Sequence, residues 1–200
     1  MPRTSRASQG GYCYHILNRG NGRNDVFHKP EDFRAFLKLL VEAQDRLPLR
    51  VTGYCLMTNR FHLLLWPHAD GDLSRFMQWL LTSHVRRYHR HYRGSGHVWQ
   101  GRFKAFPIQQ DEHYLSVLRY VERNPLRAEL VDRAQVWPWS SLSRPVVPEA
   151  QGLWSEGARI PSSMSDAVRA VRGWAGRVDL WLTAFFSGAN NGQLADCSAS

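Results

Sequence analysis

The chain has 200 residues, with 26 lysine and arginine residues against 17 aspartate and glutamate residues, and a formal net charge of +9 at pH 7. This length can bury one sizeable core, which excludes a small scaffold held by disulfides, and no apolar run reaches the length of a membrane span. The excess positive charge favours a polyanionic partner, and nucleic acid is the partner that we expect.

The first part of the chain alternates strand and helix patterns. Residues 12–19 are aromatic and branched and end at a glycine-rich turn, so they predict a strand. Apolar positions at helical spacing from Pro30 predict a helix that ends at Pro48. Residues 49–57 and 60–66 are both typical of strands and meet at a two-residue turn, which predicts an antiparallel hairpin.

The helix that follows has the clearest apolar stripe of the chain, and Asp72 is its expected N-cap. After a glycine-rich break, residues 103–110 predict a fourth strand. Asp111 is expected to cap a helix that stops near Asn124, because Pro125 disfavours helical geometry at the residue before it. This order predicts an α+β fold, a ferredoxin-like antiparallel sheet with the helices packed on one face.

The composition changes beyond Pro145 to proline, glycine, serine and alanine. Only residues 165–186 of this part keep helical spacing, and two glycines weaken that helix. We therefore expect one domain over residues 10–144 and a tail over residues 145–200 with one possible helix and no assigned chemistry.

The three cysteines, Cys13, Cys55 and Cys197, are odd in number and far apart in the sequence. They support neither a disulfide framework nor a cysteine zinc site, and a reducing compartment fits them best. The N-terminal residues are polar and basic, and no apolar segment of a secretory signal follows them. These features predict a cytoplasmic protein.

Two stretches bring chemically useful side chains onto one face of an element. Arg60 and His62 are two apart on a predicted strand, so both side chains point the same way. Tyr120 and Asn124 are four apart on a predicted helix, so both can face one site.

In order and spacing, the chain resembles the REP-associated tyrosine transposases, a branch of the HUH single-strand DNA transposases, over roughly residues 10 to 142. The stretches that carry the resemblance are residues 54–67, 99–104, 111–128 and 137–141. The resemblance implies a domain that binds single-stranded or hairpin DNA and cuts it by transesterification, with Tyr120 as the nucleophile that forms a 5′-phosphotyrosine. It also implies a Mg²⁺ or Mn²⁺ ion held by two histidines, with His62 as one of them and Asn124 as a further oxygen ligand.

Arg60 stands where the family has the first histidine of the pair. A guanidinium has no lone pair for a metal and stays protonated, so two interpretations remain open. In one, metal binding is lost or weakened and the protein only binds DNA hairpins. In the other, Arg60 acts in catalysis by forking onto the scissile phosphate and replacing part of the charge of the ion. His15, on the neighbouring predicted strand, could also approach the site.

Residues 84–104 contain no acidic residue and combine cations with aromatic side chains. Cations suit phosphates, and aromatic rings suit the unstacked bases of a single strand. The alternative is a solvated helix face. The residues that we expect to contact DNA, in this stretch and after it, are Arg86, Arg87, Arg90, Arg93, Trp99, Arg102, Lys104, Arg119, Arg123 and Arg127.

Each candidate also has a purely structural interpretation. His62 could be a satisfied core histidine, Tyr120 could be a core aromatic as Tyr114 can be, and Asn124 could simply end a helix before proline. An RNA-binding module that uses the same sheet and aromatic residues is a third functional alternative.

Overall fold

The structure is a computed structural model that describes residues 8–47, 49–108 and 112–143. The expected cap Asp111 and the tail over residues 145–200, including its expected helix at residues 165–186, lie outside these described residues. Within the described ranges, no helix combines the length and apolar character that crossing a membrane requires.

Four strands form one antiparallel sheet in the order β2-β3-β1-β4. They are β1 (Cys13–Arg19), β2 (Arg50–Met57), β3 (Arg60–Trp66) and β4 (Lys104–Ile108). The hairpin between β2 and β3 turns at the predicted two residues. The predicted α+β, ferredoxin-like sheet is confirmed.

Four α-helices accompany the sheet. They are α1 (Pro30–Arg46), α2 (Asp72–Tyr92), α3 (Glu112–Glu122) and α4 (Asn124–Arg127). The expectation that Asp72 is the N-cap of α2 is wrong, because Gly71 takes that position with a φ of 80°, a conformation that glycine adopts without strain. Asp72 is instead the first helical residue, and its carboxylate accepts a hydrogen bond from the Ala69 backbone at 2.9 Å.

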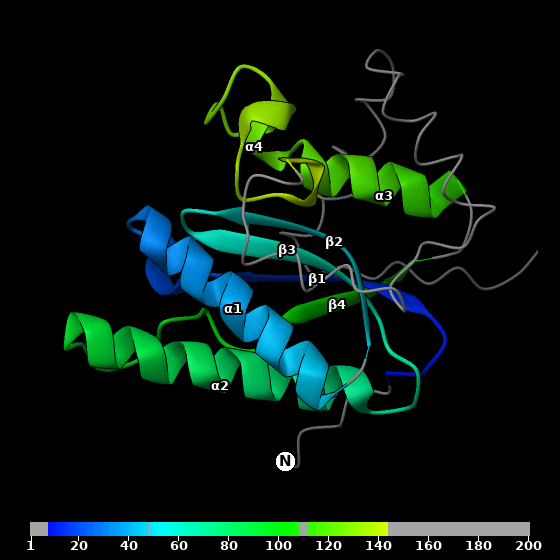
Figure 1. Ribbon diagram of the computed structural model, residues 1–200, viewed down its shortest axis with the longest axis horizontal. Coiled ribbons are helices and arrows are strands. Elements are labelled where there is room, and N and C mark those ends of the chain that lie inside the picture. Colours follow the sequence, from blue (N-terminus) through cyan, green and yellow to red (C-terminus); the bar gives the residue numbers. More distant parts are fainter. Residues whose placement is uncertain (1–7, 48, 109–111, 144–200) are drawn as a thin grey trace, which may run out of the picture.

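The helices cover both faces of the sheet, which corrects the prediction of a single covered face. Helices α1 and α2 lie on one face, and α3 and α4 lie on the other (Figure 1). Both faces need cover because successive residues of β3 are apolar and buried: Leu63 and Leu65 pack under α1 and α2, whereas Leu64 packs under α3.

A glycine lets α3 approach the sheet closely. A Cβ atom at Gly53 of β2 would lie 2.7 Å from Cδ1 of Leu118 on α3 and 3.2 Å from Cδ1 of Leu64. Any larger residue at this position would have to push these side chains aside. The missing side chain therefore helps to set the height of α3 above the sheet.

Residues 137–141 cover the outer edge of β2. The Trp137 indole donates to the Leu56 carbonyl at 2.8 Å, and the Leu56 amide donates to the Trp139 carbonyl at 2.8 Å. The Ser141 hydroxyl then links this edge to α3 through a 3.0 Å hydrogen bond to Glu122. This motif stretch therefore protects an edge strand and ties α3 to the sheet.

Trp99 is a core residue, which contradicts its expected role on DNA. Its side chain is only 5% exposed, and its ring lies 5.1 Å from that of Phe61 and 5.3 Å from that of His84, measured between centroids. The backbone around Trp99 pairs with the end of β1, because Gln100 donates its N–H to the Arg19 carbonyl at 2.8 Å. Trp99 thus anchors a segment whose neighbouring residues can reach a ligand.

Replacing Trp99 by alanine should lower the free energy of unfolding by about 3 to 5 kcal/mol, because it leaves a cavity among aromatic rings. Urea unfolding followed by circular dichroism measures this change. Arg102→Ala, at an exposed position in the same segment, is the matched control and should change stability by less than about 0.5 kcal/mol. A Trp99→Ala protein as stable as this control would contradict the assignment to the core.

Stability should also depend on pH through His84. Burial lowers the pKa of this 2% exposed imidazole to about 3. Below pH 6.5 His84 is protonated in the unfolded chain but stays neutral in the folded chain. As the pH falls below 6.5, His84 should therefore lower the free energy of unfolding by up to about 1.4 kcal/mol per pH unit. Urea unfolding at pH 7 and pH 5 should show a smaller loss for His84→Leu than for the wild type. The exposed His97→Gln variant is the control and should lose as much as the wild type.

Candidate active site

A cleft of about 610 Å³ opens on the sheet face that α3 covers, beside Tyr120. Among the described residues, five cationic side chains line it and no acidic one does. The cations are Arg19, Arg60, Arg102, Lys104 and Arg127. A concave surface with this charge attracts phosphate groups.

Strand register brings two histidines together at this cleft. Because Leu17 is paired with His62, the alternation of side chains along β1 and β3 places His15 and His62 on the same face. Nε2 of His15 lies 3.0 Å from Nδ1 of His62, a hydrogen bond between the two rings. The possibility that His15 approaches the site is thereby confirmed.

Tyr120 lies against both histidines. The centroid of its ring is 6.1 Å from the centroid of the His15 ring and 6.1 Å from that of the His62 ring, with both contacts edge-on. Tyr114, the other tyrosine of α3, is 2% exposed and belongs to the core. The helix therefore presents Tyr120 to the cleft and Tyr114 to the interior.

Both imidazoles are held in the neutral form. Burial lowers the pKa of His15 to about 4. Burial, and then the neighbouring His15 and Arg60, lower the pKa of His62 well below its ordinary value. Nε2 of His62 is buried and has no hydrogen-bond partner among the described residues, so this ring can still accept a proton or a hydrogen bond.

Arg60 lies on the same face as His62, as predicted, because Met57 and Cys55 of β2 are their respective partners. Its Nε donates to Sδ of Met57 at 3.2 Å. Burial, and then the nearby Arg19, lower the pKa of Arg60, whereas Tyr120 raises it. An arginine stays protonated at neutral pH even so, and a positive charge therefore sits permanently beside Tyr120.

Two further residues complete the wall around Tyr120. The guanidinium carbon of Arg127 lies 5.4 Å from the centre of the Tyr120 ring, a cation–π contact. Asn124 lines the cleft, although it is only 5% exposed, and its amide nitrogen donates to the Tyr120 carbonyl at 2.9 Å. Its amide oxygen is consequently the atom that could serve a ligand.

The donor atoms available for Mg²⁺ or Mn²⁺ fit such an ion poorly. Of the expected ligands, His62 offers Nε2 and Asn124 offers its amide oxygen, and both are neutral. The side-chain amides of Asn18 and Gln100, which also line the cleft, are neutral as well. The described residues contain no group of three His, Cys, Asp or Glu side chains that could hold a metal ion. Mg²⁺ in particular prefers oxygen ligands that include carboxylates. The five cations of the cleft add electrostatic repulsion.

Sequence patterns did not single out five other residues that line the cleft, which are Leu17, Asn18, Arg19, Gln100 and Phe106. The signal for Arg19 was its spacing, since it lies four residues after His15 on β1 and so shares a face with it. Gln100 and Phe106 depend on how the segment after Trp99 folds back onto β1.

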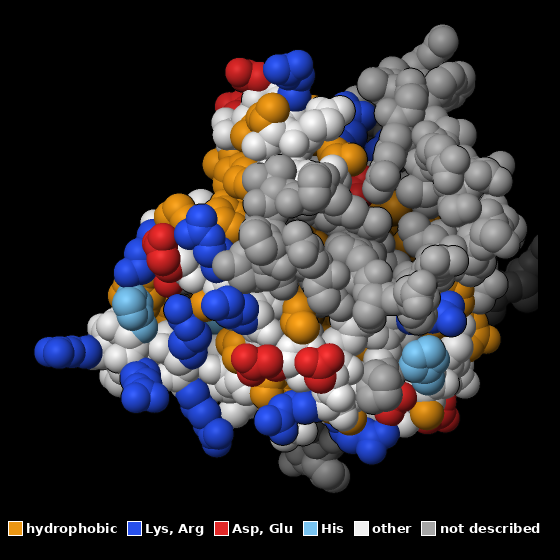
Figure 2. Space-filling view, viewed as in Figure 1, with side chains coloured by type: hydrophobic (Ala, Val, Ile, Leu, Met, Phe, Trp, Pro, Cys, Tyr) orange, Lys and Arg blue, Asp and Glu red, His pale blue; other side chains and the backbone are white. Residues whose placement is uncertain are grey.

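The predicted DNA contacts fall into two groups on opposite faces of the sheet. Arg102, Lys104 and Arg127 line the cleft with Tyr120. The arginines of α2 lie on the other helical layer, where Lys and Arg side chains gather around the ends of α1 and α2 at the left of the view (Figure 2). Arg119 and Arg123, at the C-terminal end of α3 and just after it, are not among the residues that line the cleft.

The predicted arginines in and just after α2 differ in how exposed they are. Arg86 and Arg90 of α2 and Arg93 at its C-cap are exposed, whereas Arg87 is partly covered and lies 4.0 Å from the buried Asp32 carboxylate. An arginine that already faces an acid contributes less to binding a phosphate.

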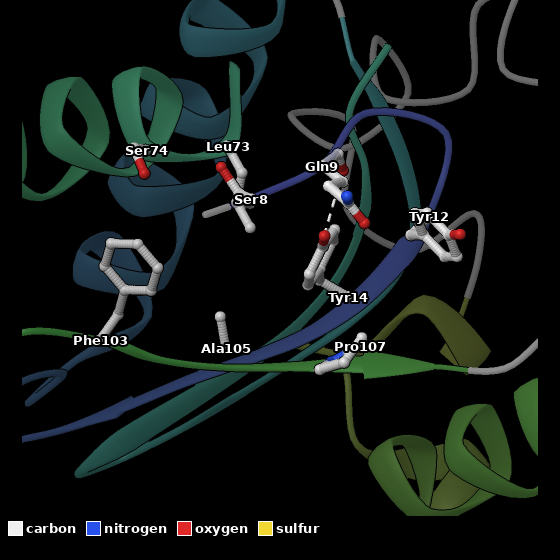
Figure 3. A pocket seen from close by; sticks show the side chains of 9 residues that line it. All are labelled: Ser8, Gln9, Tyr12, Tyr14, Leu73, Ser74, Phe103, Ala105 and Pro107. Carbon is white, nitrogen blue, oxygen red and sulfur yellow. Dashed lines mark hydrogen bonds between the residues drawn. The ribbon is translucent and has the colours of Figure 1, made fainter. Parts of the chain in front are cut away.

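A second cleft of about 530 Å³ lies on the opposite side of β4. Tyr12, Tyr14, Phe103, Ala105 and Pro107 are among its lining residues (Figure 3). Its walls hold no histidine, acid, lysine or arginine. The side chains suited to phosphoryl chemistry are therefore those of the cleft at Tyr120.

Comparison with known proteins shows the family to which this chain is related. A family model described as "Transposase IS200 like" matches residues 8–124. A Haemophilus influenzae protein, provisionally described as a REP-associated tyrosine transposase, is 26% identical over 154 residues, which cover 71% of this chain and 85% of that protein. The solved structure of a REP-associated tyrosine transposase bound to a REP hairpin matches with a TM-score of 0.57 and 21% sequence identity. The match covers 81% of this chain and 96% of that one, and it supports the fold. Because the family model spans more than half of the chain, this protein belongs to the IS200-like transposase family.

Proposed function

We propose that this protein binds single-stranded or hairpin DNA of the palindromic repeat type and cuts it by transesterification with Tyr120 as the nucleophile. One observation carries the proposal. The Tyr120 ring lies 6.1 Å from the ring of His62, which lines the cleft, and 6.1 Å from the buried ring of His15. Among the described residues that line this cleft, every charged side chain is a cation. Membership of the IS200-like family and the hairpin bound by a protein of the same fold support it.

The residues of the cleft divide the work of the reaction. Tyr120 supplies the attacking oxygen, and the neutral His62 can take up its proton, directly or through water. Arg102, Lys104 and Arg127 bind phosphates of the strand and hold it across the cleft.

The exposed residues Arg86 and Arg90 of α2 and Arg93 at its C-cap form a second binding surface in this proposal. They lie on the other face of the sheet and are therefore placed to contact phosphates away from the cleft. A hairpin has such phosphates in its paired stem, whereas a short single strand does not. Arg87 stays a secondary candidate for the same surface. Arg119 of α3 and Arg123 at the N-cap of α4 belong to the other face of the sheet and stay secondary candidates for phosphates near the cleft.

One alternative is a protein that binds hairpin DNA without cutting it, and the arginine at position 60 is the observation that favours it. Family chemistry implies a histidine pair for a metal, and this chain keeps only His62 of that pair. An RNA-binding role is the other alternative, and affinity for an RNA hairpin compared with the same DNA sequence decides it.

A covalent protein–DNA adduct is the decisive product. The wild type, incubated with a labelled single-stranded oligonucleotide that carries a repeat hairpin, should yield a denaturation-resistant adduct with the 5′ phosphate and a free 3′-hydroxyl. Tyr120→Phe should abolish the adduct and keep the affinity for the hairpin within about twofold, because only the attacking oxygen is removed.

Tyr114→Phe is the matched control for this experiment, since it removes a hydroxyl from the same helix inside the core. This variant should still form the adduct. An adduct that persists in Tyr120→Phe excludes Tyr120 as the nucleophile. Hairpin binding without any adduct in the wild type establishes the binding-only alternative.

The salt dependence of affinity should identify the phosphate contacts. Replacing Arg102, Lys104 or Arg90 by glutamine should each reduce the slope of log affinity against log salt concentration by about 0.7 to 1, because one phosphate contact is lost. Fluorescence anisotropy over a salt series measures the slope. The exposed Lys38→Gln, on α1, is the control of equal charge change and should leave the slope unaltered. An unchanged slope for a cleft residue would remove it from the interface.

A further inference from the structure

We propose that this cleft stabilises the scissile phosphate with the Arg60 guanidinium and works without a divalent ion. The inference rests on the proposed function and deepens it, because it names the group that supplies the positive charge at the reacting centre. It follows from three features of the cleft: where Arg60 is held, how the two histidines use their nitrogens, and the sign of the surrounding charge.

Arg60 is held so that its two terminal nitrogens remain available to bind a phosphate. Its Nε donates to Sδ of Met57 at 3.2 Å, which fixes the plane of the guanidinium. Within the described part of the chain, neither terminal nitrogen of Arg60 takes part in a hydrogen bond or an ion pair, and the side chain lines the same cleft as Tyr120. Two parallel N–H donors match two oxygens of one phosphate.

The two histidines are arranged for hydrogen bonding with each other. A 3.0 Å contact between Nε2 of His15 and Nδ1 of His62 uses one nitrogen of each ring, and the ring planes are inclined by only 16°. Such nearly coplanar rings direct these two nitrogens at each other and away from a shared third atom. His62 thus keeps a single nitrogen, Nε2, for the cleft.

Electrostatics disfavours a doubly charged ion at this place. Arg60, Arg19 and Arg127 all line the cleft, and none of the other described lining residues is an acid that would compensate their charge. A divalent ion would have to bind beside these charges with neutral protein ligands. A phosphodiester has the opposite sign and gains from each of the same side chains.

The step itself needs no further reactant. The oxygen of Tyr120 forms a bond to phosphorus as the bond from phosphorus to the 3′ oxygen breaks, and the electron pair of the broken bond goes to that oxygen. The phenol proton leaves to His62 or to water, and the 3′ oxygen takes up a proton to become a hydroxyl. Arg60 neutralises the charge that gathers on the two non-bridging oxygens during this displacement.

Arg60→His tests the inference by restoring the histidine that the family motif contains. Mn²⁺ binding is measured by electron paramagnetic resonance without DNA, and adduct formation is measured with Mn²⁺ or with EDTA. The wild type should bind no Mn²⁺ at a defined site and should cut equally in both conditions. Arg60→His should bind Mn²⁺ and lose at least tenfold in rate when EDTA is present. Arg60→Gln should lose at least tenfold in both conditions.

Arg133→His, at an exposed loop position, controls for the addition of a histidine and should bind no Mn²⁺ at a defined site. Thermal unfolding of each variant shows whether it is folded. Saturable Mn²⁺ binding by the wild type, or wild-type cutting that EDTA stops, overturns the inference. A wild type that is inert while Arg60→His cuts with Mn²⁺ also overturns it and leaves the chemistry of Tyr120 standing. If no variant forms an adduct under any condition, the proposed cutting function fails with it.

Discussion

The antiparallel pairing of β1 with β3 is the constraint on which the rest of the site depends. This register places His15 and His62 on one face and 3.0 Å apart, although 47 residues separate them in the sequence. The close packing of Leu118 above Gly53 then sets α3 over that face and brings Tyr120 to both rings. A slip of one residue in the pairing would turn one histidine toward α1 and α2, because side chains alternate along a strand.

Charge gives this geometry its chemical character. A buried pair of neutral imidazoles usually marks a core or a metal site, but here it borders a cleft that the described residues line with five cations and no acid. Such charges attract a phosphodiester and repel a divalent ion. In the proposed mechanism, Arg60 therefore supplies the positive charge that a bound ion would supply, and the fold stays the same.

Several residues of the motif stretches build the frame of the site. Trp99 lies in the core and carries the segment that brings Gln100 and Arg102 to the cleft. Trp137 and Ser141 cover the edge of β2 and connect it to α3. A motif that identifies a family therefore mixes residues that touch the ligand with residues that hold the elements in place.

The sequence by itself determined the main elements, their order and the fact that Arg60 and His62 share one face of a strand. These features follow from hydrophobic periodicity and strand alternation, which are local properties. Only the tertiary structure decided that α3 covers the second face, that His15 meets His62, and that Trp99 is buried. These outcomes depend on contacts between segments far apart in the chain. An aromatic residue beside arginines looks the same in a sequence whether a base or a protein core covers its ring.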